Sequence, residues 1–324
     1  MSHFDVFNGD ADGLCALHQL RLARPAEHAP DSVCVSGAKR DIALLARVDA
    51  QAGDSVTVLD ISLEANRDAL LALLARGVRV EYFDHHRSGP VPRHPLLQAH
   101  IDNSPTVCTG MLVDRYLNGS QRIWAAVAAF GDNFTAAARA LLVDMALDAQ
   151  QLLQLEQLGT CLNYNGYGDH ESDLIIAPIT LANLLRPYTD PFAFMREEPA
   201  FTTLQTARAA DLAQTLGRAP EVRLACGDIH VLPDTPWSRR VRGEFGNQLT
   251  QARPEAAHAV LTVNSQGGYM VSVRAPQVRL TGADRVCRQF EGGGGRPAAA
   301  GINHLQPGEF EVFVRAFEST FSPD

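Results

Sequence analysis

Short β-prone runs alternate with helical stretches along the first 85 residues, and this alternation limits the folds open to the chain. The predicted strands are residues 3–7, 32–36, 54–59 and 78–83. The predicted helices between them are residues 14–20, 42–48 and 66–76. The pattern predicts a parallel, doubly wound sheet, in which ligands bind outside the carboxyl ends of the strands.

Polar, metal-binding side chains follow three of these predicted strands. A single acid at such a place is usually the cap of the next helix, and a lone Asp-His-His tripeptide is equally well a solvated turn. Several of them gathered along one sheet edge predict a metal centre with oxygen and nitrogen ligands. The residues are Asn8, Asp10 and Asp12 after the first strand, Asp60 after the third, and Asp84, His85 and His86 after the fourth.

Three further stretches of the first part allow more than one interpretation. Asp132 ends an apolar, Ala-rich helix and is either a solvent-facing helix end or another metal ligand. The hydroxyls of Ser104 and Thr106 precede a helix, where capping is a more frequent use than substrate binding. Residues 163–169 are predicted to form a loop with two tyrosines, which is a lid, a base-stacking surface or an ordinary surface loop.

The second part of the chain has a different pattern. Residues 185–199 contain three prolines and are predicted to be a linker, followed by a bridging helix over 201–216. From residue 222 onward, short strands and helices indicate a small α/β or α+β domain. The predicted strands are 222–225, 229–232, 259–263 and 269–273, and the predicted helices are 239–250, 283–290 and 310–321.

A run of glycines in this second part is a candidate phosphate site. Gly293, Gly294 and Gly295 expose backbone N–H groups and are followed by Arg296. Arginines cluster nearby in the sequence, Arg274 among them, and their planar guanidinium suits phosphate oxygens. A flexible linker is the weaker interpretation, because apolar helices flank the run.

Charge and cysteine usage exclude some classes of protein. The formal net charge is −9, and residues 1–219 hold 17 basic against 26 acidic residues, which argues against binding long duplex nucleic acid. The six cysteines form no CxxC pair, no export signal is visible, and no apolar run is long enough to span a bilayer. We therefore expect a cytoplasmic protein with no membrane partner.

Taken in order, these motifs resemble the DHH phosphoesterase family with its glycine-rich associated domain, over nearly the whole length. The resemblance implies a doubly wound, mainly parallel N-terminal domain and a smaller C-terminal α/β (α+β) domain, with the active site in the cleft between them. The expected boundaries are 1–190 for the catalytic domain, 191–219 for the linker and 220–324 for the substrate-binding domain. The layout is most similar to small members that degrade very short oligonucleotides or 3′-phosphoadenosine 5′-phosphate, whereas the spacing of the first motif is closer to RecJ-type exonucleases.

The resemblance also implies a role for each candidate residue. It implies two divalent cations, Mn²⁺ in first place and Mg²⁺ as the alternative. The implied ligands are Asn8 and Asp10 for the first ion, Asp12, His85 and Asp132 for the second, and Asp60 as the bridge. The implied catalytic residues are His86 facing the phosphate, Asp84 orienting the histidines and Arg274 neutralising charge, and the implied substrate contacts are Gly293, Gly294, Gly295, Arg296, Ser104 and Thr106. Two positions depart from the family pattern, because Asn8 stands where His or Asp is usual and Arg296 where His is common.

The function expected on these grounds is Mn²⁺-dependent hydrolysis of phosphate esters of short nucleotides. Alternatives with the same site are a cyclic dinucleotide phosphodiesterase, a single-strand exonuclease and an exopolyphosphatase. A nucleotide-binding module with a vestigial site is the alternative without catalysis. The expected partners are a short nucleotide or other phosphate-ester substrate and, in a possible homodimer, a second copy of the chain.

Overall fold

The computed structural model describes residues 1–26, 28, 31–264 and 266–322. The chain divides into two compact units, Met1–Ala207 and Arg208–Asp324. The division falls within helix α9 (Pro199–Ala213), inside the stretch 191–219 that was predicted to connect two domains. Across the described ranges, no helix is long and apolar enough to cross a membrane. Each unit has its own sheet and its own hydrophobic core.

Unit 1 is built on a parallel sheet with the strand order β2-β1-β3-β4-β5. The strands are β1 (His3–Phe7), β2 (Val33–Val35), β3 (Ser55–Leu59), β4 (Arg79–Asp84) and β5 (Leu97–Ile101). The register pairs Phe7 with Leu59 and Leu59 with Phe83, so β1, β3 and β4 end side by side. The predicted parallel sheet is confirmed, and β5 is a strand that the sequence pattern did not reveal.

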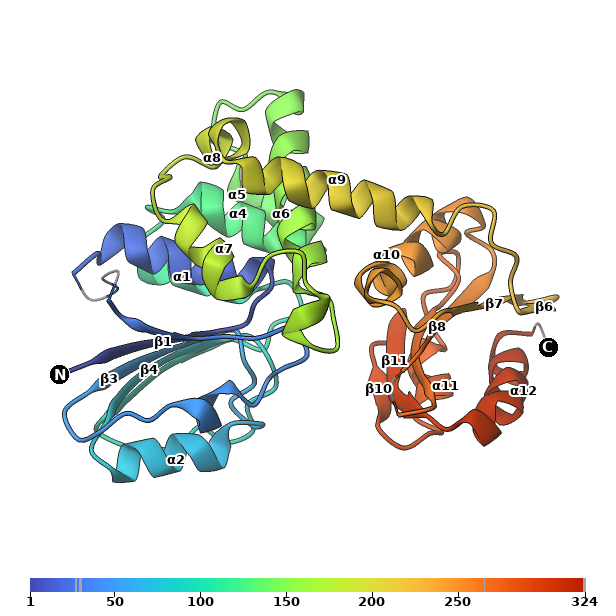
Figure 1. Cartoon of the computed structure of the whole chain (residues 1–324), viewed down its shortest axis with the longest axis horizontal. Coiled ribbons are helices and arrows are strands. Elements are labelled where there is room, and N and C mark those ends of the chain that lie inside the picture. Colours follow the sequence, from blue (N-terminus) through green and yellow to red (C-terminus); the bar gives the residue numbers. More distant parts are fainter. Residues whose placement is uncertain (27, 29–30, 265, 323–324) are drawn as a thin grey trace. The chain divides into compact units, whose positions relative to one another are not determined.

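Apolar cores cover both faces of this sheet. Helix α1 (Ala11–Ala23) lies on one side and α2 (Arg67–Ala75) on the other (Figure 1). The core on the α1 side includes Trp124, and the other core includes Tyr82. Because both faces are buried, the ends of the strands are the polar part of the sheet. The remaining helices of unit 1 are α3 (Thr109–Tyr116), α4 (Arg122–Gly131), α5 (Thr135–Leu141), α6 (Ala149–Gly166), α7 (Pro178–Leu185) and α8 (Pro191–Glu197).

Three sequence predictions in unit 1 need correction. The helix expected over 42–48 is only a 3₁₀ turn, Leu44–Arg47. The loop expected over 163–169 is wrong for its first half, because α6 continues to Gly166 from a capping box in which Asp148 and Gln151 bond each other's backbone N–H. The linker expected over 185–199 contains α8, because Pro191 takes the first helical position and Asp190 caps it.

Unit 2 contains a mixed sheet with the strand order β10-β11-β9-β8-β7-β6. Only the pair β7 and β8 runs parallel among the pairs of the described residues. Three phenylalanines of α12, Phe313, Phe317 and Phe321, fill its core. The elements are β6 (Val222–Leu224), β7 (Gly227–Leu232), α10 (Pro236–Ala252), β8 (Ala257–Val263), β9 (Tyr269–Arg274), α11 (Ala283–Cys287), β10 (Gly293–Gly295), β11 (Ala299–Leu305) and α12 (Phe310–Phe321).

The glycine run, which the sequence marked as a candidate phosphate site, is a strand and not a flexible linker. Gly293–Gly295 pair antiparallel with β11, and Arg296 and Ala299 exchange backbone hydrogen bonds of 2.9 and 3.2 Å around a tight turn. Glycine is required here by packing, since a Cβ on Gly293 would lie 1.8 Å from the carbonyl oxygen of Cys287. Close packing therefore explains Gly293 and Gly295, whereas a Cβ on Gly294 would meet no atom within 4 Å. The phosphate-binding role of Gly293, Gly294, Gly295 and Arg296 stays a prediction.

Candidate metal centre

The loop after β1 holds its two carboxylates in different ways. Asp10 caps α1, because its Oδ1 accepts hydrogen bonds from the N–H groups of Asp12 (3.0 Å) and Gly13 (3.1 Å). Asp12 is fully buried and accepts 2.7 Å bonds from the backbone N–H groups of Thr109 and Gly110, where α3 begins. The capping interpretation is thus correct for Asp10, and Asp12 needs a different explanation.

Asp60 follows β3 in an unusual backbone conformation. Its φ is +60°, a left-handed value that costs most residues about 1–2 kcal/mol and that Asp tolerates better than most. Its Oδ1 accepts a 3.0 Å bond from the hydroxyl of Thr109, and the side chain is buried. Strain of this kind at a buried acid is typical of functional sites.

Asp84, His85 and His86 have three distinct environments at the end of β4. Asp84 is buried, and its Oδ1 accepts from the N–H and the Nδ1 of His86, at 3.1 and 2.7 Å. His85 is 8% exposed, whereas the side chain of His86 is 44% exposed. Asp84 was predicted to orient both histidines, but of the two it is His86 that bonds its carboxylate, whose other oxygen accepts from the N–H of Leu63.

The Nε2 atom of His85 lies at the centre of the carboxylates. It is 3.4 Å from Oδ1 of Asp60, 3.5 Å from Oδ2 of Asp132 and 3.8 Å from Oδ2 of Asp12. Asp132, directly after α4, is therefore brought to the sheet edge as expected for a ligand. Two three-donor sets arise, Asp12–His85–Asp132 and Asp60–His85–His86, with the donor atoms of each set within 4.8 Å of one another.

The electrostatics of this cluster favour a bound cation. Burial raises the pKa of Asp60 well above its usual range, and Asp12 and Asp10 raise it further. Burial and Asp132 likewise raise the pKa of Asp12. Crowded carboxylates with one imidazole are a donor set that suits Mn²⁺ or Mg²⁺. The buried Oδ1 of Asn8 accepts no hydrogen bond among the described residues, so Asn8 also fits a ligand or a water contact.

We expect Asp60→Asn to stabilise the metal-free protein at neutral pH, by on the order of 1–2 kcal/mol. Asn also tolerates the left-handed conformation of position 60. Folding raises the pKa of Asp60, so protonated Asp60 contributes to the free energy of unfolding below about pH 4. This contribution is lost as the pH rises through the pKa of Asp60 in the folded protein. The advantage of Asp60→Asn should therefore grow with pH in urea unfolding curves recorded with a chelator.

Asp5→Asn is the matched control for Asp60→Asn. Asp5 is equally buried, but His28 (2.6 Å), His3 (3.1 Å) and Ser32 (2.9 Å) donate to it. Burial would raise the pKa of Asp5, but these histidines lower it well below its usual range. Asp5→Asn should lose about 3 kcal/mol at neutral pH. A loss of stability in Asp60→Asn at high pH would contradict the proposed carboxylate repulsion.

Sequence reasoning missed three residues of the cluster. Thr109 supplies the hydroxyl that contacts Asp60, whereas Ser104 bonds Asp102 and both Ser104 and Thr106 are exposed. The ammonium of Lys39 lies 2.5 Å from Oδ2 of Asp10, and Asn163 accepts from it at 3.0 Å. Burial would lower the pKa of Lys39, but Asp10 and Asp132 raise it well above its usual value. One signal was available, since Lys39 is the only lysine among the 28 Lys and Arg residues of the sequence.

Arg274 belongs to unit 2 and has a structural explanation there. Its guanidinium donates to Oδ1 of Asn247 (2.7 Å) and to the carbonyl oxygen of Gly243 (3.2 Å), both on α10, and to the hydroxyl of Ser272 (2.8 Å). These bonds fasten α10 to β9. The predicted catalytic role of Arg274 stays a prediction.

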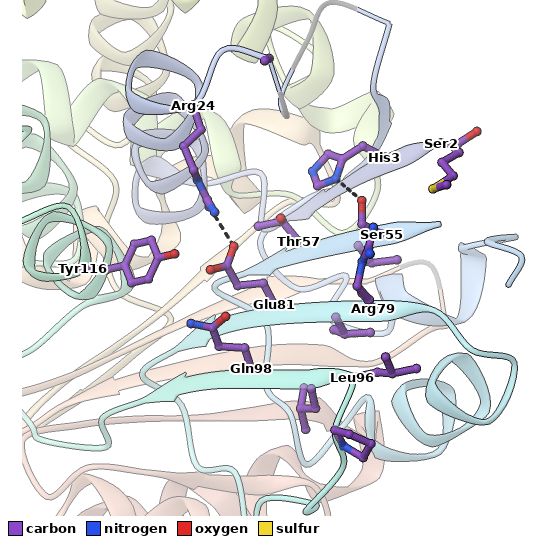
Figure 2. Close-up of a pocket in the computed structure, with 16 residues that line it drawn as sticks. Ser2, His3, Arg24, Ser55, Thr57, Arg79, Glu81, Leu96, Gln98 and Tyr116 are labelled. Atoms are coloured by element: carbon purple, nitrogen blue, oxygen red, sulfur yellow. Dashed lines mark hydrogen bonds and ion pairs between the residues drawn. The ribbon is translucent and has the colours of Figure 1, made fainter. Parts of the chain in front are cut away.

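A polar cavity of about 580 Å³ lies at the opposite, amino-terminal edge of the sheet in unit 1 (Figure 2). First residues of several strands line it, His3, Ser55 and Arg79 among them. An ion pair of 2.8 Å between Arg24 and Glu81 occupies part of its lining. Parallel sheets bind ligands at the other edge, so we do not include this cavity in the candidate site.

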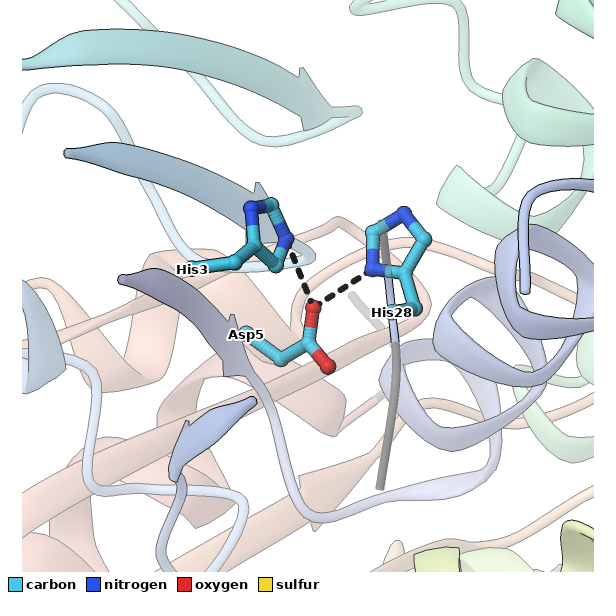
Figure 3. Close-up of side chains that lie close together, drawn as sticks. All are labelled: His3, Asp5 and His28. Atoms are coloured by element: carbon cyan, nitrogen blue, oxygen red, sulfur yellow. Dashed lines mark hydrogen bonds and ion pairs between the residues drawn. The ribbon is translucent and has the colours of Figure 1, made fainter. Parts of the chain in front are cut away.

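His3, Asp5 and His28 form another cluster of metal-binding side chain types (Figure 3). Both imidazoles donate to the same oxygen of Asp5, and the guanidinium of Arg21 lies 3.7 Å from the other oxygen. Asp5 therefore has a full set of donors and a cation beside it, and a metal ion would have to compete with Arg21. We interpret the cluster as a buried hydrogen-bond network.

Comparison with known proteins is informative at the level of structure. No family model and no curated protein matches the sequence. Exonuclease RecJ bound to manganese matches at 18% identity with a TM-score of 0.63, over 100% of this chain and 91% of the other. The DHH domain of a protein described as a member of a family of ribosomal proteins matches at 16% identity with a TM-score of 0.64, over 98% and 86%. A pGpG-specific phosphodiesterase from Vibrio cholerae matches at 12% identity with a TM-score of 0.55, over 99% of each chain.

At these identities the likeness shows the fold. The chain has the fold of these solved structures, which include RecJ and a DHH domain, and this confirms the two-domain α/β fold that the resemblance implied.

Proposed function

We propose that the chain is a hydrolase of phosphate esters that requires a divalent cation, Mn²⁺ before Mg²⁺, and acts on short nucleotides. The observation that carries the proposal is the convergence of Asp12, His85 and Asp132 at the carboxyl edge of a parallel sheet. Asp12 lies in the first turn of α1, and His85 and Asp132 directly follow β4 and α4. Donors that are far apart in sequence thus meet in one place, as the parts of an active site do.

The residues of the cluster fit a metal-assisted hydrolysis. Asp12, His85 and Asp132 would hold the ion, and Asp60 lies within reach of the same imidazole. A divalent cation in such a site lowers the pKa of a bound water and polarises a phosphoryl oxygen. The backbone N–H groups of α3 keep Asp12 in place. His86, held by Asp84 and exposed, would donate to the substrate phosphate.

A fold neighbour and the charge of the chain both support the preference for short nucleotides. The pGpG-specific phosphodiesterase from Vibrio cholerae has the same fold over 99% of each chain. The acidic excess of residues 1–219 disfavours long polyanions. In unit 2, the exposed Arg296 at the turn between β10 and β11 would add a phosphate contact of its own. RecJ, a fold neighbour, is described as an exonuclease, so exonuclease activity is the main competing function.

A substrate panel tests this proposal. With saturating Mn²⁺ we expect the highest kcat/KM on a linear dinucleotide or 3′-phosphoadenosine 5′-phosphate, at least about tenfold above single-stranded DNA, cyclic dinucleotides and polyphosphate. A chelator should remove the activity and added Mn²⁺ should restore it. A preference for single-stranded DNA would assign an exonuclease instead, and bound Mn²⁺ without turnover of any substrate would assign a binding module.

A further inference from the structure

Lys39 fills one side of the candidate centre with a positive charge of the protein itself. Its Nζ lies 2.5 Å from Oδ2 of Asp10 and 3.0 Å from Oδ1 of Asp132. The other oxygen of Asp10 already accepts two backbone N–H groups as the cap of α1. Both carboxylate oxygens of Asp10 therefore have partners within the protein.

The position of Lys39 is fixed from several elements of unit 1. Its backbone N–H donates to the carbonyl oxygen of Gly166 (2.8 Å), at the end of α6. Its own carbonyl oxygen accepts from Nδ2 of Asn8 at 3.3 Å. Asn163 accepts from the ammonium at 3.0 Å, and the ring of Tyr167 lies 5.4 Å from Nζ. These contacts fix both the backbone and the ammonium of Lys39, whereas the side chain of a typical surface lysine moves freely in solvent.

The choice of lysine at this position is selective. The other 27 of the 28 basic residues in the sequence are arginine. Lysine carries a compact point charge, whereas the guanidinium of arginine is a wide planar fork. A chain that otherwise uses arginine throughout has an ammonium only where three oxygens of Asp10, Asp132 and Asn163 converge. Three oxygens around a small cation resemble the environment of a bound metal ion.

The donor sets found in the cluster are built on His85 and not on Asp10. Within the part of the chain that the structure describes, neither of the two donor sets at this edge of the sheet includes Asp10, and both include His85. The neutral Asn8 adds no charge to attract another cation on that side. A divalent ion bound to Asp10 would have to displace the ammonium from Oδ2 or lie directly beside it.

We propose that Lys39 acts as a built-in cation on the Asp10 side, so that the centre takes a single divalent ion, held by Asp12, His85 and Asp132. This inference deepens the proposed function and rests on its metal centre, and it revises the two ions implied by the family resemblance. The ammonium balances Asp10 and positions Asp132, whose other oxygen faces His85. Lys39 is thus a positioning residue, and Asn8 and Lys39 together replace the first metal site.

Metal stoichiometry tests the inference without any measurement of activity. The full chain dialysed against Mn²⁺ at about 1 mM should bind one ion, with the electron paramagnetic resonance spectrum of isolated Mn²⁺. Lys39→Met should allow a second ion, and Asn8→Asp combined with Lys39→Met should bind it at least about tenfold more tightly and give a spin-coupled pair. Arg40→Met removes a charge from the neighbouring residue and should leave the stoichiometry at one.

A measurement on the unaltered protein covers the case in which the Lys39 variants do not fold. Because Lys39 is the only lysine, labelling with ¹⁵N-lysine gives a single ammonium resonance, which should persist in slow exchange when Mg²⁺ saturates the centre. Loss of that resonance, or two spin-coupled Mn²⁺ ions in the unaltered chain, would overturn the inference and leave the proposed function standing. One bound ion without hydrolysis of any phosphate ester would overturn the proposed function and leave the inference standing.

Discussion

His85→Ala should lower turnover by about a thousandfold or more and abolish tight Mn²⁺ binding. The Nε2 atom of His85 lies within 3.8 Å of carboxylate oxygens of Asp12, Asp60 and Asp132, so it belongs to both donor sets at this edge. A metal ion supplies several kcal/mol of transition-state stabilisation in phosphoryl chemistry, and each 1.4 kcal/mol is about tenfold in rate. The loss should therefore appear in kcat, measured with the best substrate of the panel.

His85→Ala is a cleaner test than substitution of an acid. Asp12 also holds the start of α3 through two backbone N–H groups, so its removal would disturb the fold together with the metal. His94→Ala is the matched control, because His94 lies between β4 and β5 and its Nδ1 accepts a bond from the N–H of Leu96. The proposal of a metal centre fails if His85→Ala binds Mn²⁺ as tightly as the parent chain does.

The parts of the site that lie at strand ends could be predicted from the sequence. Asp60 and His85 directly follow β3 and β4, and Asp12 lies in the first turn of the helix after β1. Parallel strands paired in this register end at one edge of the sheet. For such residues, the strand pattern and the rule that parallel sheets bind ligands at the carboxyl ends of their strands are enough to predict a shared site. Asp132 was harder to predict as a site residue, because its position depends on how α4 packs against α1. Its place at the end of a predicted helix was nevertheless a signal that it could be a ligand.

The parts that depend on packing could not be predicted. Asn163 was assigned to a loop because glycines and tyrosines surround it, but α6 continues to Gly166. The carbonyl oxygen of Gly166 accepts a bond from the distant backbone N–H of Lys39. Only this helix brings Asn163 to the ammonium of Lys39. The glycine run was interpreted as a phosphate site with exposed N–H groups, since pattern alone does not reveal that Gly293 must pack against a carbonyl oxygen. In each case packing in the folded chain overrides the local preference of the residues.

His86→Ala should lower kcat by about a hundredfold to a thousandfold while Mn²⁺ affinity changes little. Asp84 accepts from Nδ1 of His86 at 2.7 Å, which leaves Nε2 as the nitrogen for a phosphate oxygen. Burial would lower the pKa of His86, but Asp84 raises it overall, so the imidazolium form is favoured as a donor to phosphate. Neighbouring histidines should thus give opposite results, with metal affinity lost in His85→Ala and kept in His86→Ala.

Asp84→Asn separates orientation of His86 from its chemistry. Asn keeps an acceptor oxygen for Nδ1 of His86 but removes the charge, and the loss of such a supporting partner costs about tenfold to a hundredfold in activity. Asp84 is buried and also accepts from the N–H of Leu63, so unfolding curves must accompany the kinetics. The double variant with His86→Ala should be no slower than His86→Ala alone, because Asp84 then has no imidazole to orient. Additive losses in the double variant would show that Asp84 acts on the reaction independently of His86.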